Sequence, residues 1–267
     1  MSDARVHGSD RWRAVDGSAA ADLQQFLEVL AARLRPMRVA SYEQLAIGRG
    51  SAVLDHGCGT GIAAEELADL VGTDGRVVAA DFSQAMVDAT AARCSGRPNV
   101  TVHRGDIRSI DLESDAVDAA RCERVVMHLA PDEADAAIGE LVRVTRPGGR
   151  VAVLEPCHAQ MVITGAANVV ATFIASQANP YAGLRVRAAL ARVRCTDVTV
   201  TPFARVTTSL AELRPIVPIE RVLSTAVEAG RISEAEAADE LAAVEALDDA
   251  GGFICSTLTY LTAGTVT

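Results

Sequence analysis

Apolar positions between Ala21 and Leu45 recur with the spacing of an α-helix. Leu23, Phe26, Leu27 and Leu30 fall on one helical face. Pro36 lies inside this pattern, and an internal proline removes a backbone hydrogen bond and clashes with the preceding turn. The pattern therefore predicts two helices here, after a loose arm at residues 1–20.

From residue 51 to residue 154, short apolar runs alternate with amphipathic segments. The runs predict strands at 51–55, 76–81, 100–103, 117–122 and 151–154, and the segments between them predict helices at 62–70, 84–93 and 132–144. Strands that alternate with helices indicate βαβ units and a parallel sheet. The fold class is therefore α/β and Rossmann-like.

The last third of the chain has a different pattern. Residues 157–194 read as helical with a loop at 179–180, and short strands are predicted at 198–203 and 253–261. Two helices, broken at Gly230, are predicted within 211–250. A helical insertion between short strands favours a lid over the sheet. We therefore expect one domain over 1–267, with a helical cap at 1–49, a core at 50–155 and substrate-side elements at 156–267.

Composition excludes several kinds of partner. The chain has a formal net charge of -10 and only 3% aromatic residues, which argues against nucleic acid. Its six cysteines show no zinc-site spacing, and scattered thiols in a chain of this length are typical of a protein of the reducing cytoplasm. The N-terminus lacks a signal peptide's apolar core, and no run of about 18 apolar residues occurs, so we expect no membrane span. Whether the chain is a homodimer is left open.

The sequence VLDHGCGTG, residues 53–61, carries the strongest chemical signal. An apolar strand ends at Asp55 and enters a turn with Gly57, Gly59 and Gly61, where glycines let the backbone approach a ligand closely. Ile62 stands where the third glycine of a dinucleotide-binding GxGxxG belongs. The motif therefore favours a nucleoside-type ligand with an amino-acid end over a pyrophosphate.

Two further acidic residues follow the next predicted strands. Asp81 ends the strand at 76–81 and is placed to accept ribose hydroxyls, with Phe82 and Met86 positioned to sandwich an adenine. Asp106 and Ile107 follow the strand at 100–103, where they suit the adenine amino group and ring. Each acid alone is more often a turn or capping residue. Together and in order they indicate a ligand at the carboxyl edge of the sheet.

With these motifs the chain resembles the class I S-adenosylmethionine (SAM) dependent methyltransferases, in particular the ubiquinone/menaquinone-methyltransferase-like (methyltransferase type 11) group of actinobacterial small-molecule pathways. The matching segments are VLDHGCGTG, VVAADFSQAMVDAT, HRGDI, ARCERVVMHL and ELVRVTRPGGRVAVLEP. The resemblance is strong over residues 50–155 and continues weakly to Thr267. It implies a seven-stranded sheet whose last strand is antiparallel.

The resemblance also implies a role for each site residue. The methionine end of SAM would be held by Asp55, Gly57, Gly59 and Gly61, the ribose by Asp81, and the adenine by Asp106 with Ile107. Cys58 lies between two of these glycines at the cofactor site, and we expect it to be a small packing residue rather than a nucleophile. Cys122, Glu123 and Arg124 would border the sulfonium, and Arg38 would meet the SAM carboxylate. His56 departs from the family, which usually has a small or branched apolar residue there; we expect a hydrogen-bonded histidine in or near the core.

Two histidines are candidates for a general base. His158, just past the fifth strand, is the first candidate, and Glu155 beside it either acts as a base or orients a neighbour. His128 follows the fourth strand, where a structural or SAM-bordering role competes with that of a base. Trp12, Tyr42 and Tyr181 either line a pocket or pack in the core. No tight cluster of oxygen ligands occurs, so no metal is expected.

The function expected from these residues is methyl transfer from SAM to an O, N or C atom of a hydrophobic small molecule in secondary-metabolite or quinone-like biosynthesis. A SAM-binding cyclase or decarboxylase on the same fold is the alternative, and a nicotinamide-dependent dehydrogenase is a weaker one. The substrate pocket is expected between the N-terminal helices, residues 156–181 and the insertion at 211–250, which would close as a lid. Alternatively, the apolar residues of the insertion only pack its helices or form a dimer interface.

Overall fold

A computed structural model describes residues 20–267, with side chains from residue 24 onward. The predicted arm, with His7 and Trp12, lies outside the described residues, as does the side chain of Leu23.

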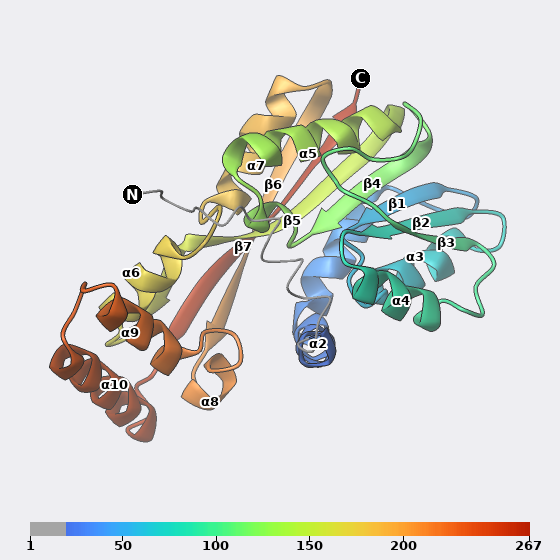
Figure 1. Ribbon diagram of the computed structural model, residues 1–267. Coiled ribbons are helices and arrows are strands. Elements are labelled where there is room, and N and C mark those ends of the chain that lie inside the picture. The colour runs from blue at the N-terminus through green and yellow to red at the C-terminus, as the bar shows by residue number, and fades with distance from the viewer. Residues whose placement is uncertain (1–19) are drawn as a thin grey trace.

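Figure 1 shows a single twisted sheet with helices on both faces. The strands are β1 (Ala52–His56), β2 (Arg76–Asp81), β3 (Val100–Arg104), β4 (Val117–Glu123), β5 (Thr145–Ile163), β6 (Cys195–Thr207) and β7 (Cys255–Val266). The helices are α2 (Ala20–Leu45), α3 (Ile62–Val71), α4 (Gln84–Arg93), the 3-10 turn η2 (Val126–His128), α5 (Pro131–Val144), α6 (Ala167–Ala175), α7 (Ala182–Arg192), α8 (Leu210–Leu213), α9 (Ile219–Glu228) and α10 (Glu234–Asp249).

The sheet has seven strands in the order β3-β2-β1-β4-β5-β7-β6. The pairs from β3 to β5 are parallel, and β7 runs antiparallel to both β5 and β6. This arrangement confirms the predicted Rossmann-like sheet and its antiparallel last strand. The carboxyl ends of β1, β2, β3 and β4 therefore meet at one edge, where the predicted acidic residues stand.

Two apolar cores cover the two faces of the sheet. Neighbouring strand residues point to opposite faces, so Leu54 packs with α5 and α7 on one face, while Val53 packs with α2 and α3 on the other. Both side chains are fully buried. This double coverage explains why the predicted strands read as continuous apolar runs.

Helix α2 continues through Pro36, so the prediction of two helices was wrong. The helix places Leu30, Leu34 and Met37 in the core beneath it, and Tyr42 and Leu45 extend the same buried face beyond the proline. Burial on both sides of Pro36 outweighs the cost of the missing hydrogen bond, because tertiary packing supplies most helix stability in a protein.

The prediction of helix for 157–163 was also wrong, because β5 continues to Ile163 and pairs with β7 through Val162 and Ser256. Met161 and Ile163 are buried, whereas Val162 is 58% exposed. This alternation with a period of two is typical of a strand. The strands β6 and β7 are also longer than predicted. Residues 204–207 of β6 pair with residues 255–258 of β7, and residues 262–265 of β7 pair with residues 150–153 of β5.

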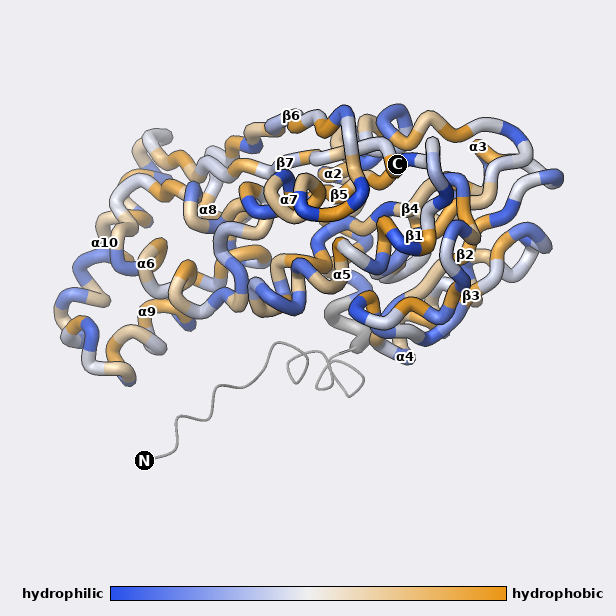
Figure 2. Tube along the Cα trace, turned by 90° about the horizontal axis from the view of Figure 1, so that it is seen from above, coloured by the Kyte–Doolittle hydropathy of each residue, from blue (hydrophilic) through white to orange (hydrophobic). Residues whose placement is uncertain are grey.

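The extended ends of β5, β6 and β7 carry a lobe made of α6, α8, α9 and α10, here called the distal lobe (Figure 1). It has a core of its own that includes Met161, Val169, Leu213, Leu223 and Phe253. Figure 2, seen from above, places the distal lobe and the strands β1 to β3 at opposite ends of the molecule.

Residues 211–250 form three helices rather than two. The predicted break at Gly230 is present, with a φ of 64° after α9, and Ser233 caps the start of α10. The additional helix is α8, which Pro218 and the preceding turn separate from α9. Among the described residues, no helix combines the length and apolar character that crossing a membrane requires.

Candidate cofactor-binding site

A cavity of about 280 Å³ lies at the carboxyl edge of β1, β2 and β4, beneath α2. Its walls bring together most of the residues that the sequence singled out, and α2 supplies an apolar roof. The predicted residues that line it are Arg38, Asp55, Gly57, Cys58, Gly59, Asp81, Phe82, Met86, Asp106, Ile107, Glu123, Arg124 and His128. The roof residues are Phe26, Leu27, Leu30, Ala31 and Leu34.

Three of the predicted residues lie outside the walls of this cavity. Gly61 lies behind the turn, and Cys122 is completely buried within β4. His158 on β5 is not among the lining residues either. The binding roles inferred from the family for the lining residues stay predictions, because the structure contains no ligand.

The glycine-rich turn after β1 is held against β2 by two hydrogen bonds, in which Gly57 N and Cys58 N donate to Ala80 O at 2.7 and 3.0 Å. All three glycines have positive φ values, which favour glycine. A Cβ on Gly57 would lie 2.1 Å from a Val125 methyl, and one on Gly61 would lie 2.9 Å from Thr90 Cα. These two glycines therefore permit close packing within the protein.

Gly59 differs, because a Cβ there would have only one neighbour within 4 Å, Leu27 Cδ1 at 3.9 Å. The space that its missing side chain leaves is thus part of the cavity. Internal packing does not require this glycine to be small, so the open space fits a bound molecule that approaches the turn. Cys58 lies between the glycines with its Sγ 3.3 Å from Thr90 Oγ1, as expected of a small packing residue.

Asp55 at the end of β1 is buried against Arg121 of β4, its partner in the sheet register. Arg121 Nη1 donates to Asp55 Oδ1 at 2.7 Å and Nη2 donates to Glu123 Oε2 at 2.6 Å. Burial raises the pKa of Asp55, and the Arg121 charge opposes that rise. Burial by itself would lower the pKa of Arg121, but Asp55 and Glu123 outweigh it and raise the pKa, so Arg121 stays charged.

Asp55 Oδ2 and Arg121 Nε are buried and have no hydrogen-bond partner among residues 20–267. Buried polar atoms are nearly always paired, so an unpaired carboxylate oxygen at the cavity wall fits a ligand that donates a hydrogen bond. An amino group of the kind that SAM carries is such a donor. Sequence reasoning missed Arg121, although a charged residue inside an apolar strand was a signal for it.

Asp81 at the end of β2 ties the strand to the turn. Its Oδ2 accepts from Gly59 N at 3.0 Å, and its Oδ1 accepts from Ser83 N at 2.9 Å. Burial raises the pKa of Asp81, while these backbone donors lower it. Each carboxylate oxygen can accept more than one hydrogen bond, so Asp81 retains capacity for two ribose hydroxyls.

Asp106 faces the cavity from the loop after β3 and is bound to Arg108. Arg108 Nε and Nη2 donate to its two oxygens at 2.9 and 2.6 Å, and this hydrogen bonding lowers the pKa of Asp106. Arg108 also pairs with Glu133 of α5. Ile107 is buried beside it, as an adenine-packing residue would be.

His56 is buried near Asp106, and burial lowers its pKa to about 4 despite the Asp106 charge. Its Nδ1 has no hydrogen-bond partner among the described residues, so the expected core position is observed without the expected hydrogen bond at that atom. His56 also lines the cavity, a placement that the sequence did not predict.

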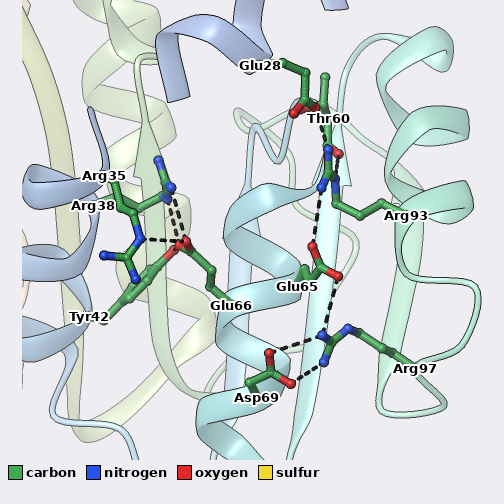
Figure 3. A network of polar contacts seen from close by, with 10 residues as sticks. All are labelled: Glu28, Arg35, Arg38, Tyr42, Thr60, Glu65, Glu66, Asp69, Arg93 and Arg97. Carbon is green, nitrogen blue, oxygen red and sulfur yellow. Dashed lines mark hydrogen bonds and ion pairs between the residues drawn. The ribbon is translucent and has the colours of Figure 1, made fainter. Parts of the chain in front are cut away.

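The guanidinium of Arg38 lies in a polar network between α2 and α3. Its Nε and Nη2 donate to Glu66 at 2.8 and 3.2 Å, and Nη1 donates to Ala31 O. Tyr42 Oη donates to the same Glu66, as Figure 3 shows. The expected contact with a cofactor carboxylate stays a prediction, since every guanidinium nitrogen here already has a partner within the protein.

Arg93 of α4 connects the roof to the turn. Its Nη2 donates to Glu28 of α2 at 2.6 Å, and its Nε donates to Thr60 O at 2.8 Å (Figure 3). The side chain therefore bridges the cavity's apolar roof and its glycine-rich floor. This bridge and the Glu66 network hold α2 across the carboxyl edge of the sheet.

Glu155 orients the segment after β4 and does not face the cavity. It accepts hydrogen bonds from the backbone N–H groups of Val125, Val126 and Met127 at 2.7–3.2 Å. Burial raises its pKa to about 7, although these donors oppose the rise. The orienting role that the sequence left open for Glu155 is therefore the one observed, and it fixes η2 and His128 at the cavity wall.

The expectation that the 211–250 insertion closes over the cavity is not met in this structure. Its apolar side chains, including Val217, Ile219 and Leu223, pack within the distal lobe. The alternative, that these residues pack their own helices together, describes what is observed. Among the described residues, no cluster of three or more His, Cys, Asp or Glu side chains is arranged to hold a metal ion.

Comparison with known proteins identifies the core. Residues 53–149 match the family model described as "Methyltransferase domain". An uncharacterized 37.1 kDa protein in transposon TN4556 of Streptomyces fradiae is 39% identical over 141 residues, which are 52% of this chain and 40% of that protein. A demethylmenaquinone methyltransferase of Beutenbergia cavernae is 36% identical over 121 residues, 45% of this chain and 47% of that enzyme.

The chain thus spans less than half the length of these two relatives. The solved structure of the [4+2]-cyclase SpnF superimposes with a TM-score of 0.59 at 20% identity, covering 98% of this chain and 97% of that one. At this identity the likeness concerns the fold. The matched domain, the glycine-rich turn and the strand order together identify residues 53–149 as a class I SAM-dependent methyltransferase domain.

Proposed function

We propose that this protein transfers the methyl group of SAM to an O, N or C atom of a hydrophobic small molecule. The observation that carries the proposal is a cavity wall that contains both the open space at Gly59 and the unpaired Oδ2 of buried Asp55. A ligand with a hydrogen-bond donor on a compact chain fits there. The methionine end of SAM has this chemistry, and Asp81 and Asp106 follow along the same wall in the order that ribose and adenine require.

When bound, SAM supplies a methyl group that is already activated by its sulfonium, so the protein mainly has to align donor and acceptor. Asp55 and Arg121 fix the charge at the end of β1, Asp81 holds the turn, and Glu155 fixes the η2 wall. The roof residues of α2 exclude water from the cavity. No described residue of this set is required to form a covalent bond.

Two histidines are candidates for a general base. His128 lines the cavity and is the candidate in direct reach of a molecule there. Burial, with the nearby Arg124 charge as a second cause, lowers the pKa of His158 to about 4, which leaves it neutral at pH 7 and a weak base. We therefore assign a base role first to His128, for acceptors that must lose a proton, and we propose that no metal is needed.

The substrate is proposed to be an apolar small molecule because the cavity roof is apolar. Phe26, Leu27, Leu30 and Leu34 face the site from α2. Nucleic acid would meet a chain with a net charge of -10. We further propose that the protein acts in secondary-metabolite or quinone-like biosynthesis in the cytoplasm.

Gly59→Ala tests the carrying observation. The added methyl would enter the cavity, so we expect SAM affinity to fall by about tenfold or more in calorimetric titration, as a lost ligand contact of about 1.4 kcal/mol would require. Gly50→Ala is the matched control, because Gly50 has a similarly positive φ of 86° and open space around it, away from the cavity. Equal SAM affinities for the two variants would refute the assignment.

Turnover is tested with SAM labelled on its methyl carbon, incubated with small-molecule extract fractions and followed by mass spectrometry. Methyl transfer predicts S-adenosylhomocysteine together with a labelled product, and activity that persists in EDTA. Tight SAM binding without either product would favour the cyclase or decarboxylase alternative. A shift in melting temperature caused by NAD and not by SAM would favour the dehydrogenase.

A further inference from the structure

Within residues 20–267, arginines that are withdrawn from solvent differ in their partners. Arg38 and Arg121 are buried and donate to the carboxylates of Glu66, Asp55 and Glu123. Arg124 and Arg205 are half-buried, and neither forms an ion pair with any residue of 20–267. Because a desolvated guanidinium without a counter-ion is costly, Arg124 and Arg205 indicate that an anion belongs beside them.

Arg124 lies where β4 meets the cavity. It follows Glu123, adopts a φ of 59° and lines the cavity wall. Only a few per cent of residues other than glycine adopt this conformation. Burial lowers the pKa of Arg124, Glu155 and Glu123 oppose this, and the positive charge of Arg205 adds to the lowering. Arg124 and Arg205 therefore lie within electrostatic range of each other.

Arg205 lies on β6, the edge strand of the sheet. It pairs in register with Thr257 of β7 and lies two residues after Phe203, on the face that α2 covers. Its Nη1 is completely buried and has no hydrogen-bond partner among the described residues. Burial lowers the pKa of Arg205, and exposed Arg33 of α2 adds to that effect, while Cys255 and Glu212 oppose it.

Two neutral polar side chains in the same region also lack partners. Asn179 is 1% exposed, and both its amide nitrogen and its amide oxygen are unpaired among residues 20–267. His158 Nδ1 is buried and unpaired, and the Arg124 charge affects the pKa of His158. Ala159 N donates to Pro180 O at 3.0 Å, which holds the His158 segment beside the Asn179 segment.

We propose that Arg124 and Arg205, with His158 and Asn179 beside them, bind an anionic group on the small-molecule substrate, either a carboxylate or a phosphate. The inference deepens the proposed function and rests on it for the identity of the bound molecule. A guanidinium presents donors in a planar fork that matches both oxyanions. The neutral side chains provide further hydrogen bonds without repelling the arginines.

The placement also suits methyl transfer. Arg124 is shared between the cofactor cavity and the anion site, so an acidic group held there would put the rest of the substrate at the cavity mouth. Phe173 of α6 packs edge-on against His158, with ring centroids 5.3 Å apart, and supplies an apolar neighbour for the substrate body. The substrate class is therefore an amphipathic acid: an apolar body with one carboxylate or phosphate.

Three probes with the same ring test this site: benzoate, phenyl phosphate and the neutral benzyl alcohol. Each is titrated into the full-length protein by calorimetry at constant ionic strength, with and without saturating S-adenosylhomocysteine. We expect at least one anion to bind about tenfold or more tightly than benzyl alcohol, as charge-assisted hydrogen bonds imply. A preference between the two anions identifies the group as a carboxylate or a phosphate.

Arg205→Gln should lower the affinity for the preferred anion by about tenfold or more, and Arg205→Lys should retain part of it. Arg187→Gln is the matched control, since Arg187 is exposed on α7, away from the site. Melting curves check that each variant folds. If Arg205→Gln does not fold, the comparison is made with Arg205→Lys.

The proposal is overturned if neither anion binds better than benzyl alcohol, or if the Arg205 variants bind the anion as well as Arg187→Gln does. The affinity for S-adenosylhomocysteine is a separate readout. If the wild-type protein does not bind S-adenosylhomocysteine, the proposed function is refuted. The anion titration carried out without S-adenosylhomocysteine would still show whether the anion site exists.

Discussion

Replacing Arg121 with methionine tests the charge pair on which the cavity wall is built. The Arg121 side chain is 1% exposed and donates to Asp55 at 2.7 Å and to Glu123 at 2.6 Å. Its guanidinium also lies 5.5 Å from the centre of the Tyr42 ring. Methionine keeps much of the volume but leaves a buried carboxylate without a counter-charge.

We expect Arg121→Met to lower the free energy of unfolding by about 3–5 kcal/mol, the usual cost of breaking a buried pair by removing one partner. Urea denaturation monitored by circular dichroism measures this difference. Arg214→Met is the control, because Arg214 makes two ion pairs of similar length, with Glu220 and Glu245, on the exposed surface of the distal lobe. Such surface pairs contribute about 0–1 kcal/mol.

The deficit of Arg121→Met should depend on pH. Burial already raises the pKa of Asp55, and losing Arg121 removes the charge that opposes this rise. A carboxyl group whose folded pKa is raised destabilises the folded state increasingly as pH rises above the unfolded pKa. The deficit should therefore shrink as pH falls toward the ordinary aspartate range. A variant within 1 kcal/mol of wild type at neutral pH would refute the reasoning.

Three further outcomes follow from the described geometry. Asp81→Ala should weaken SAM binding by about 2–3 kcal/mol, because two hydroxyl groups lose a charged acceptor; unchanged affinity by calorimetry would reject the ribose role. The pKa of His56, lowered to about 4, means that the unfolded chain binds a proton near pH 6.5 that the folded chain does not. Stability measured by urea should therefore fall as pH drops from about 6.5 to 4, with a smaller fall in His56→Gln; equal falls in both proteins would contradict this. Leu223→Ala should cost about 2–5 kcal/mol of unfolding free energy, since Leu223 is 3% exposed in the distal lobe. The SAM affinity of this variant should be unchanged, and a large loss would mean that the distal lobe and the cavity are coupled.

Much of the site could be predicted from local sequence because each acidic residue directly follows an apolar run. Parallel strands bring their carboxyl ends to one edge, so Asp55, Asp81 and Asp106 had to lie near one another. The partners of these acids could not be predicted in the same way. Arg121 meets Asp55 across 66 residues of sequence, and only the register of β1 with β4 places the two side chains together.

The second half of the chain shows the same division. Residues 157–163 read as helical from their composition, yet they continue β5 because β7 is available to pair with them. The apolar residues of 211–250 were correctly expected to be buried. The sequence did not indicate which part of the molecule buries them. In the structure they pack in the distal lobe's own core and not against the cofactor cavity.

By itself, the sequence determined the alternation of strands and helices, the glycine-rich turn and the order of the acidic strand ends, because these depend on local periodicity and backbone freedom. The tertiary structure decided what lies across from each of them. Helix α2 stays continuous through Pro36 because both of its halves are buried, Glu66 binds the guanidinium of Arg38, and Arg124 and Arg205 lie within electrostatic range of each other. These outcomes depend on contacts between residues far apart in the chain, which no local pattern encodes.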